Sequence, residues 1–375
     1  MASGIPDLPV LYAEHPIERY RDPARYEAEL RTVFTQHWLV ATRVESLPRR
    51  GALPVTVAGR GLVLTRDGDT VRAFHNVCSH RAAEVVEGCT ESARLRCGYH
   101  GWTYGLDGRL VAVPGRARFG PDLDVESCGL PPVHAEAWGG WVWVHLGTPA
   151  ADVATWLEGF ADEVDRYRGE DQRVYGTRTE RVGLNWKAAV DAFNETYHVA
   201  YIHPQTVGRL VTAKHTWFTY AGPHSRSIIP VTQTLSDAQG RSAGAAGRRV
   251  KPELLPEQAE HHANYTFFPN VIANMLPTWG VTIVFDPVSH WETDLKVWMT
   301  ADPPRSERQE HGLEAQWVEF CKVLDEDLHF VGTVGRGMRS EAARTLRLGG
   351  EEEKLVRFHR LVDAAADADL ARRGG

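Results

Sequence analysis

The chain has 375 residues, of which 43% are hydrophobic and 24% charged, and its formal net charge is −7. This balance is typical of a globular protein long enough for two domains, and it excludes a disordered or fibrous chain. The mild negative charge gives no electrostatic reason to bind nucleic acid or anionic lipid. Since we find neither a signal peptide nor the ~20 consecutive apolar residues that span a bilayer, we expect a cytoplasmic protein without nucleic-acid or membrane partners.

The first part of the chain predicts one helix followed by short strands. Residues 14–38 place apolar side chains at helical spacing. From Leu53 onward, brief β-rich runs alternate with turns that contain glycine, a pattern typical of antiparallel strands. The expected strands are 53–58, 62–65, 71–74, 102–106, 110–113 and 138–146. We therefore predict a small all-β domain over residues 40–148.

The periodicity changes again at Val153, where residues 153–167 show one apolar helical face. Strand-like segments follow, a helix is expected from Asn185 to Ile202, and the chain is mostly helical from Ser306 onward. The expected strands are 173–182, 215–220, 228–235 and 280–300. The fold class is therefore α+β: the small all-β domain precedes an α+β domain, made of residues 1–39 and 149–375, with an antiparallel sheet flanked by helices.

Five cysteines are too few for a disulfide scaffold, and their odd number favours reduced thiols, some of them ligands. Two of these cysteines are each followed closely by a histidine. Cys78 and His80 form one arm, and Cys97 and His100 form a second arm sixteen residues further on. A [2Fe–2S] cluster in which two histidines replace two cysteines has a raised potential. We predict that Cys78 and Cys97 bind one iron of such a cluster and that His80 and His100 bind the other.

A structural zinc site is the alternative, because zinc also accepts two cysteines and two histidines. Zinc motifs usually pair like ligands within each arm, whereas both arms here are mixed. The other cysteines have no partner motif and are expected to be small buried hydrophobic side chains; they are Cys89, Cys128 and Cys321.

A second group of candidate ligands lies on and just after the predicted helix 185–202. Asp191, Glu195 and His198 are spaced by four and three residues, which places them on one helical face. His203 follows immediately before Pro204, where the helix must end. Two imidazoles so placed can converge on one metal ion, with carboxylates beside them. Histidines near a helix end are also common without any metal.

Both groups resemble one family. The segments 78–81 and 97–102 resemble the cluster loops of Rieske proteins, especially the α subunits of ring-hydroxylating oxygenases, and 191–203 resembles the iron-binding helix of that family. The resemblance implies that Cys78, His80, Cys97 and His100 hold a [2Fe–2S] cluster. It also implies that a mononuclear Fe(II) binds His198, His203 and one distant carboxylate.

The third iron ligand is expected in the acidic segment 325–327, which resembles the corresponding family segment. Alignment favours Asp327 over Asp325, and a solvated acidic helix face is the alternative. In the family, a carboxylate at the position of Glu195 links an iron-binding histidine to a cluster histidine of the neighbouring subunit. In this chain the resemblance implies His198 and the neighbouring subunit's His100 for these two positions. The family most often has aspartate at this position, and Asp191 is the other candidate for the role.

The resemblance implies the terminal oxygenase of a multicomponent system that hydroxylates or oxidatively demethylates a small organic substrate with O2. Electrons come from NAD(P)H through a separate reductase, with a ferredoxin in some systems, because the chain has no dinucleotide-binding motif. It also implies a homotrimer, with a small β subunit in part of the family. The alternatives are cis-dihydroxylation of an aromatic ring and, from another class, a non-catalytic Rieske electron-transfer protein. We expect residues 236–249 to form a loop that influences substrate choice.

Overall fold

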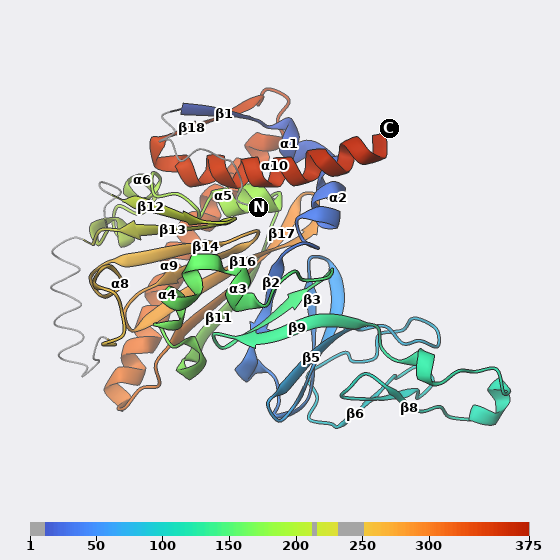
Figure 1. Cartoon of the computed structure of the whole chain (residues 1–375). Coiled ribbons are helices and arrows are strands. Elements are labelled where there is room, and N and C mark those ends of the chain that lie inside the picture. The colour runs from blue at the N-terminus through green and yellow to red at the C-terminus, as the bar shows by residue number, and fades with distance from the viewer. Residues whose placement is uncertain (1–11, 212–215, 232–250, 375) are drawn as a thin grey trace. The chain divides into compact units, whose positions relative to one another are not determined.

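The computed structural model describes residues 12–211, 216–231 and 251–374, which fall into two compact units (Figure 1). One unit is Phe34–Trp156, and the other combines Met1–Val33 with Leu157–Gly375. The predicted all-β range 40–148 lies within the first unit. The predicted loop 236–249 lies outside the described residues. None of the helices in the described ranges has both the length and the apolar character that crossing a bilayer requires.

The unit Phe34–Trp156 consists of antiparallel strands in two sheets. Six strands pair in the order β2-β10-β9-β5-β4-β3, and three short strands pair in the order β6-β7-β8. One short helix, α3 (Val153–Trp156), follows the last strand. The strand bounds are β2 (Trp38–Arg43), β3 (Arg50–Val57), β4 (Arg60–Asp67), β5 (Thr70–His75), β6 (Arg94–Arg96), β7 (Thr103–Gly105), β8 (Leu110–Ala112), β9 (Pro132–Trp138) and β10 (Trp141–His145).

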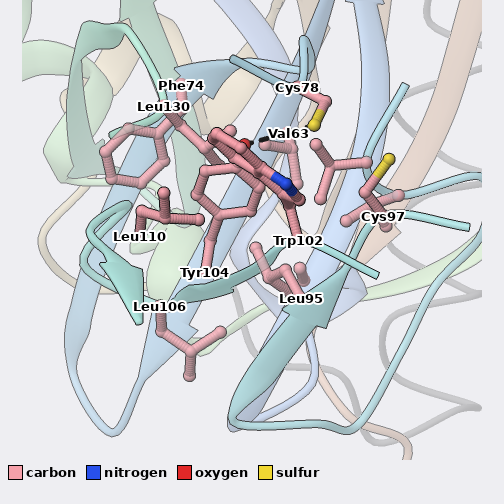
Figure 2. Close-up of a cluster of buried hydrophobic side chains, with 13 residues drawn as sticks. Val63, Phe74, Cys78, Leu95, Cys97, Trp102, Tyr104, Leu106, Leu110 and Leu130 are labelled. Atoms are coloured by element: carbon pink, nitrogen blue, oxygen red, sulfur yellow. Dashed lines mark hydrogen bonds between the residues drawn. The ribbon is translucent and has the colours of Figure 1, made fainter. Parts of the chain in front are cut away.

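Beneath the cluster loops of this unit lies a buried apolar core (Figure 2). Its members come from both sheets and the loops between them, and include Phe74, Trp102 and Tyr104. Gly108, which has a φ of +79°, ends the β7–β8 turn against Phe74, and a Cβ there would lie 2.3 Å from that ring. Such close packing gives the loops a rigid support, because a filled core tolerates little displacement.

The second unit contains a seven-stranded antiparallel sheet in the order β11-β17-β16-β15-β14-β13-β12. Together with the first unit it confirms the predicted α+β fold class. The strand bounds are β11 (Arg173–Val182), β12 (Trp217–Ala221), β13 (His224–Ile229), β14 (His262–Phe267), β15 (Val271–Met275), β16 (Trp279–Ser289) and β17 (Glu292–Ala301). A separate ladder pairs β1 (Tyr12–Pro16) with β18 (Thr345–Gly349).

Helices pack around this sheet. The longest, α9 (Glu307–Arg339), packs on β11, and α10 (Glu353–Gly374) packs on α2 (Pro23–Thr32) (Figure 1). The shorter helices are α1 (Glu18–Arg21), α4 (Ala161–Asp165), α5 (Trp186–Asp191), α6 (Val199–Ile202) and α8 (Pro256–Glu260). The helices α5 and α6 flank residues 192–198, which include Glu195 and His198, and His203 directly follows α6.

Several predicted elements were wrong in extent. The expected helix 14–38 begins as strand β1 and breaks at Asp22, whose side chain caps α2 by accepting a hydrogen bond from the Ala24 amide. The expected strand 138–146 is shorter and begins at Trp141, since Gly139 and Gly140 both have positive φ and form the turn between β9 and β10. The expected helix 185–202 is two short helices, α5 and α6, separated by residues 192–198.

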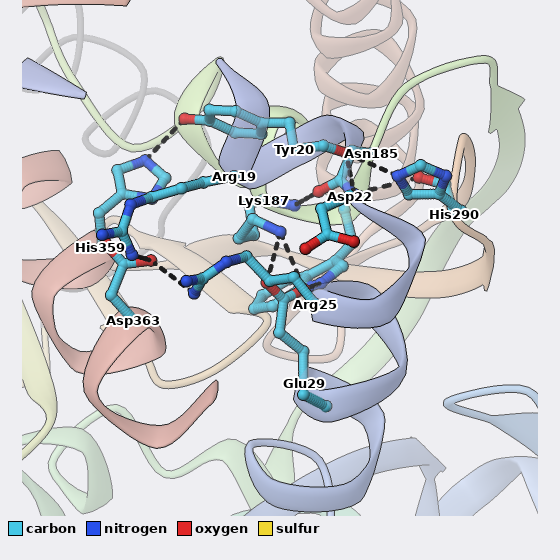
Figure 3. A network of polar contacts seen from close by, with 12 residues as sticks. Arg19, Tyr20, Asp22, Arg25, Glu29, Asn185, Lys187, His290, His359 and Asp363 are labelled. Carbon is cyan, nitrogen blue, oxygen red and sulfur yellow. Dashed lines mark hydrogen bonds and ion pairs between the residues drawn. The ribbon is translucent and has the colours of Figure 1, made fainter. Parts of the chain in front are cut away.

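A buried ion pair joins α2 to α5 (Figure 3). The Lys187 ammonium donates to both carboxylate oxygens of Glu29, at 2.6 and 2.8 Å, and the Trp186 indole nitrogen donates to the same carboxylate. Both charged side chains are almost fully buried. Burial lowers the pKa of Lys187, although the attraction of Glu29 opposes the shift. The pair therefore ties the N-terminal helix to the segment that leads to the candidate metal ligands.

Replacing Lys187 with methionine is expected to destabilise the protein by about 3–5 kcal/mol, because Glu29 is then a buried carboxylate without its counter-ion. The measurement is the shift of the urea unfolding midpoint. The matched control is the double variant Lys187→Met with Glu29→Gln, which removes the stranded charge and should recover part of the loss. A single variant as stable as the parent contradicts this account of the pair.

Candidate functional site

The two predicted cluster arms follow strands of the Phe34–Trp156 unit. Cys78 comes after β5, and its amide donates to the Ala83 carbonyl at 2.8 Å. Cys97 comes after β6, and its amide donates to the Trp102 carbonyl at 2.9 Å. These bonds close each arm into a tight loop. Both cysteine side chains are buried in the core, and Figure 2 shows their sulfur atoms toward the same end of it.

The two histidines of the arms also meet. The rings of His80 and His100 lie 4.5 Å apart, and His80 stacks on Trp102 with 5.0 Å between ring centres. The Nδ1 atom of His80 is buried and has no hydrogen-bond partner in the described part of the chain. An orphaned buried nitrogen is costly unless a ligand satisfies it. Two buried thiols and two adjacent imidazoles are the donor set of a Rieske cluster, so the residues present fit this group.

One hydroxyl contacts a candidate cluster thiol. Tyr104 Oη lies 3.3 Å from Cys78 Sγ and accepts a hydrogen bond from the Ser79 amide. Hydrogen bonds to ligand sulfur stabilise the reduced, more negative cluster and so raise its reduction potential. We expect Tyr104→Phe to keep the visible spectrum and to lower the potential measured by redox titration. The control is Tyr99→Phe at an exposed position; an unchanged potential in Tyr104→Phe contradicts the assignment.

The second candidate site is built on the break between α5 and α6. Asn185 caps α5 by accepting from the Lys187 amide, and the helix ends at Asp191. The chain then leaves the helix, and Glu195 Oε2 accepts from the backbone amide of His198 at 3.1 Å, just before α6 begins. Glu195 Oε1 also bonds the Nδ1 atom of His198. Glu195 and His198 therefore contact each other outside either helix, and the prediction that they share one helical face with Asp191 was wrong.

Three predicted ligands meet at one point. Asp327 Oδ1, on α9, lies 2.9 Å from His203 Nε2 and 3.7 Å from His198 Nε2. One ligand atom from each of these residues lies within 4.8 Å of the others. Two histidines and one carboxylate arranged in this way leave one face open and suit non-haem Fe(II). We name His198, His203 and Asp327 the metal trio.

The other acidic candidates have different partners. Asp325 forms an ion pair with Arg178 at 2.7 Å, and its side chain is 61% exposed. Asp191 accepts from Tyr20 Oη at 2.7 Å and contacts His359 Nε2 at 2.8 Å. These contacts place Asp325 and Asp191 in separate polar networks. Of the two aspartates considered for the third ligand position, the structure brings Asp327 to the histidines.

Sequence reasoning missed Glu326, which supports the second histidine. Its Oε2 atom accepts from His203 Nδ1 at 2.7 Å and from Thr206 Oγ1 at 2.6 Å. Each histidine of the metal trio thus has a carboxylate on Nδ1, which turns Nε2 toward Asp327. Burial alone lowers the pKa of His203, but the hydrogen bonds to Asp327 and Glu326 outweigh it and raise this pKa. Because a metal ion binds the neutral imidazole, protonation of His203 competes with metal binding.

A cavity of about 690 Å³ opens onto the metal trio. Its walls come from the segment 193–211, from strands β12 to β16 and from α9. Most of the lining is apolar, with aromatic rings contributed by Phe193, Phe218, Trp279 and Phe320. A cavity of this size can enclose a small organic molecule beside the metal trio.

Known families match both units. The model of the "Rieske [2Fe-2S] domain" matches residues 37–129, and that of the "Ring hydroxylating alpha subunit (catalytic domain)" matches residues 161–368. The chain therefore belongs to the family of Rieske ring-hydroxylating oxygenase α subunits, which confirms the predicted resemblance. Its cofactors are a Rieske [2Fe–2S] cluster and a mononuclear iron.

Among individual relatives, choline monooxygenase of Spinacia oleracea is 33% identical over 92% of this chain and 76% of its own length. The carnitine monooxygenase oxygenase subunit of Acinetobacter baumannii is 26% identical over 92% of both. The glycine betaine monooxygenase oxygenase subunit of Chromohalobacter salexigens is 31% identical over 56% of this chain and 47% of its own length. The chain thus spans about half the length of some of the curated relatives it matches.

Solved structures share the fold. A quaternary ammonium Rieske monooxygenase in complex with its substrate L-carnitine superposes with a TM-score of 0.78 at 22% identity, covering 96% of both chains. Naphthalene 1,2-dioxygenase with bound indole superposes with a TM-score of 0.77 at 18% identity, covering 94% of this chain and 92% of that one. At these identities the likeness extends to the fold alone.

Proposed function

We propose that this protein is the terminal oxygenase of a multicomponent Rieske system that hydroxylates a C–H bond next to the nitrogen of a small trimethylammonium compound. Electrons come from NAD(P)H through a separate reductase, with or without a ferredoxin. The observation that carries the proposal is the metal trio at the end of a largely apolar cavity. We assign His198, His203 and Asp327 as iron ligands, and Cys78, His80, Cys97 and His100 as cluster ligands.

The cavity lining suits a trimethylammonium group. Such a group is a cation whose surface consists of methyl groups, so apolar walls and aromatic faces both stabilise it. Trp279 and Phe218 supply aromatic faces, and Glu195 and Asp327 supply negative charge. The names of the relatives from spinach, Acinetobacter and Chromohalobacter contain choline, carnitine and glycine betaine, which are all trimethylammonium compounds.

The reaction consumes one O2, two electrons and two protons for each C–H bond that becomes C–OH, and it releases one water. His198, His203 and Asp327 would hold the iron, which would supply the reductive activation of O2. Glu195 and Glu326 hold the two imidazoles in place, and the apolar walls orient the substrate and exclude water. When the hydroxylated carbon is bonded to the quaternary nitrogen, the neutral amine leaves with the C–N electron pair, and a carbonyl group and a proton remain.

The test is turnover of choline, carnitine and glycine betaine with NADH, a reductase and ¹⁸O₂, followed by mass spectrometry of the products. We expect an amine and a carbonyl product, or a hydroxylated one, with oxidation dependent on O2 and NADH. Oxidation of aromatic hydrocarbons to diols that retain both labelled oxygen atoms, without oxidation of any trimethylammonium compound, contradicts the proposal and supports cis-dihydroxylation. Absence of all turnover in protein loaded with iron supports a non-catalytic electron carrier.

We also propose a homotrimer in which the cluster of one subunit reduces the iron of its neighbour, with Glu195 linking His198 to the neighbour's His100. Glu195→Gln keeps the shape but removes the charge, so we expect oxidation of the cluster in a single turnover to slow by about 10- to 100-fold. Cluster content should stay unchanged, and the rate is compared per bound iron because Glu195 also orients His198. Glu319→Gln, at another carboxylate of the cavity wall, is the control. Normal rates in Glu195→Gln show that the bridging role is wrong.

A further inference from the structure

A row of polar side chains crosses one wall of the otherwise apolar cavity. Ser227 of β13 pairs in register with Asn264 of β14, and Asn264 pairs with Asn274 of β15. Directly paired residues on neighbouring strands project from the same face of a sheet. All three residues line the cavity, and the next position in the row, on β16, is Val281. We name Ser227, Asn264 and Asn274 the polar row.

Hydrogen bonds fix the direction in which the amides of the polar row present their donors. Lys354 Nζ donates to Asn264 Oδ1 at 2.7 Å, which leaves the Asn264 NH2 group to donate to Asn274 Oδ1 at 2.8 Å. His262 Nε2 lies 3.1 Å from the same Asn274 oxygen and must also donate, because that oxygen only accepts. The oxygen of Asn274 is therefore fully engaged. Its NH2 group has no hydrogen-bond partner among the described residues.

A second amide donor on the cavity wall is also unmatched. Asn194 Oδ1 accepts from Thr266 Oγ1 at 2.6 Å, and Thr266 lies two residues from Asn264 on the same face of β14. This bond orients Asn194 so that its Nδ2 atom is left over, buried and without a partner in the described ranges. Buried donors are nearly always satisfied in folded proteins. The Asn194 donor is therefore buried and unsatisfied, and the Asn274 NH2 group lines the same cavity without a partner among the described residues, so an acceptor on a bound molecule could satisfy both.

The charge behind the polar row indicates which acceptor is expected. Lys354 is 3% exposed, and no carboxylate of the described residues forms an ion pair with it. Burial lowers the pKa of Lys354 to about 7. A buried ammonium group without a counter-ion is costly, and a nearby anion offsets that cost. An anionic acceptor at Asn274 is linked to this ammonium through the amide side chains of Asn264 and Asn274, and it fits the site better than a neutral one.

We propose that the polar row is a carboxylate-binding subsite, in which the Asn274 NH2 group donates to the carboxylate of the substrate. The inference rests on the proposed function and narrows it: the substrate is a trimethylammonium carboxylate rather than a trimethylammonium alcohol. The aromatic and acidic part of the cavity takes the ammonium end, and the polar row takes the carboxylate. Asn274 is a specificity residue in this account, and Lys354 acts on the ligand through Asn264.

The first test uses the holoprotein and three probes of similar size, with affinities measured by calorimetry. Glycine betaine carries both groups, choline replaces the carboxylate with an alcohol, and 3,3-dimethylbutanoate keeps the carboxylate but replaces the ammonium with a tert-butyl group. We expect glycine betaine to bind about 10- to 100-fold more tightly than choline. Its carboxylate can accept a charge-assisted hydrogen bond from the Asn274 NH2 group, whereas choline has no carboxylate. Choline binding equal to or tighter than that of glycine betaine overturns the proposal.

The second test uses Asn274→Leu, which keeps the volume but removes the donor. We expect glycine betaine to lose about tenfold or more in affinity, and choline to change by less than about twofold. Val281→Ala, at the next position of the same row, should change the affinities for glycine betaine and choline by the same factor. Lys354→Met should weaken the binding of glycine betaine but not that of choline. An intact cluster spectrum and iron content show that each variant is folded, and equal effects of Asn274→Leu on both ligands overturn the subsite.

The tert-butyl probe separates this inference from the proposed function. If 3,3-dimethylbutanoate binds and Asn274→Leu abolishes its binding, while no trimethylammonium compound binds, the carboxylate subsite stands and the trimethylammonium proposal fails. If choline and glycine betaine are both oxidised with equal efficiency and 3,3-dimethylbutanoate does not bind, the proposed function stands and the subsite fails.

Discussion

Asp327→Ala is expected to abolish binding of the mononuclear iron and to reduce turnover by at least about 100-fold. Asp327 supplies the oxygen ligand toward which His198 Nε2 and His203 Nε2 both turn. Without it, two neutral imidazoles remain, and their affinity for Fe(II) is too weak to retain the ion during purification. The measurement is iron and sulfide per chain together with the visible spectrum. The spectrum should be unchanged, because the cluster ligands belong to the other unit.

The control for this prediction lies two residues away on the same helix. Asp325→Ala removes an aspartate that is exposed and paired with Arg178. We expect this variant to keep its full iron content and turnover, with at most about 1 kcal/mol lost from the surface ion pair. Loss of iron in Asp325→Ala with retention in Asp327→Ala reverses the assignment of the third ligand.

Cys97→Ala is expected to bleach the protein. Cys97 is buried, and its thiolate is one of only two soft ligands available to the cluster in the predicted arms. A [2Fe–2S] cluster with a missing thiolate loses inorganic sulfide and its visible absorption. Cys89→Ala is the matched control, since Cys89 is an exposed free cysteine and the prediction that it is buried was wrong. A variant Cys97→Ala that stays brown with unchanged sulfide content contradicts the ligand assignment.

The cluster site was easier to predict than the iron site because the ligands within each cluster arm are close in sequence, whereas the iron ligands are not. The cluster arms are local: each Cys-x-His or Cys-x-x-His arm is a short loop, and its mixed composition is visible in consecutive residues. The iron site combines His203 with a carboxylate 124 residues away. Spacing cannot reveal such a contact, so resemblance to the family was needed to single out Asp327. The structure adds the reason, since Asp325 turns to Arg178.

The break after α5 shows where helical periodicity misleads. Asp191, Glu195 and His198 have helical spacing, yet Asp191 bonds Tyr20 and His359 while Glu195 bonds His198. Tertiary contacts override local propensity here, because the side chain of Asn194 bonds Thr266 and that of Glu195 caps the next turn. The three residues do have helical spacing in the sequence, but the segment between Asp191 and Glu195 is not helical.

Glu326 and the polar row could not be identified from sequence for a related reason. Glu326 stands in an acidic run that is usually solvated, and its role depends on His203 and Thr206, which lie more than a hundred residues earlier. The polar row exists only through strand register, because Asn264 and Asn274 become neighbours when β14 pairs with β15. Register and long-range pairing are properties of the folded sheet.

The most direct test of the central claim is a metal count on protein purified without oxygen, combined with its visible spectrum. We expect a brown protein with about three irons and about two inorganic sulfides per chain, two irons in the cluster and one at the metal trio. About two irons with sulfide, with no uptake of added Fe(II), contradicts the mononuclear site. A colourless protein that contains zinc and no sulfide contradicts both sites.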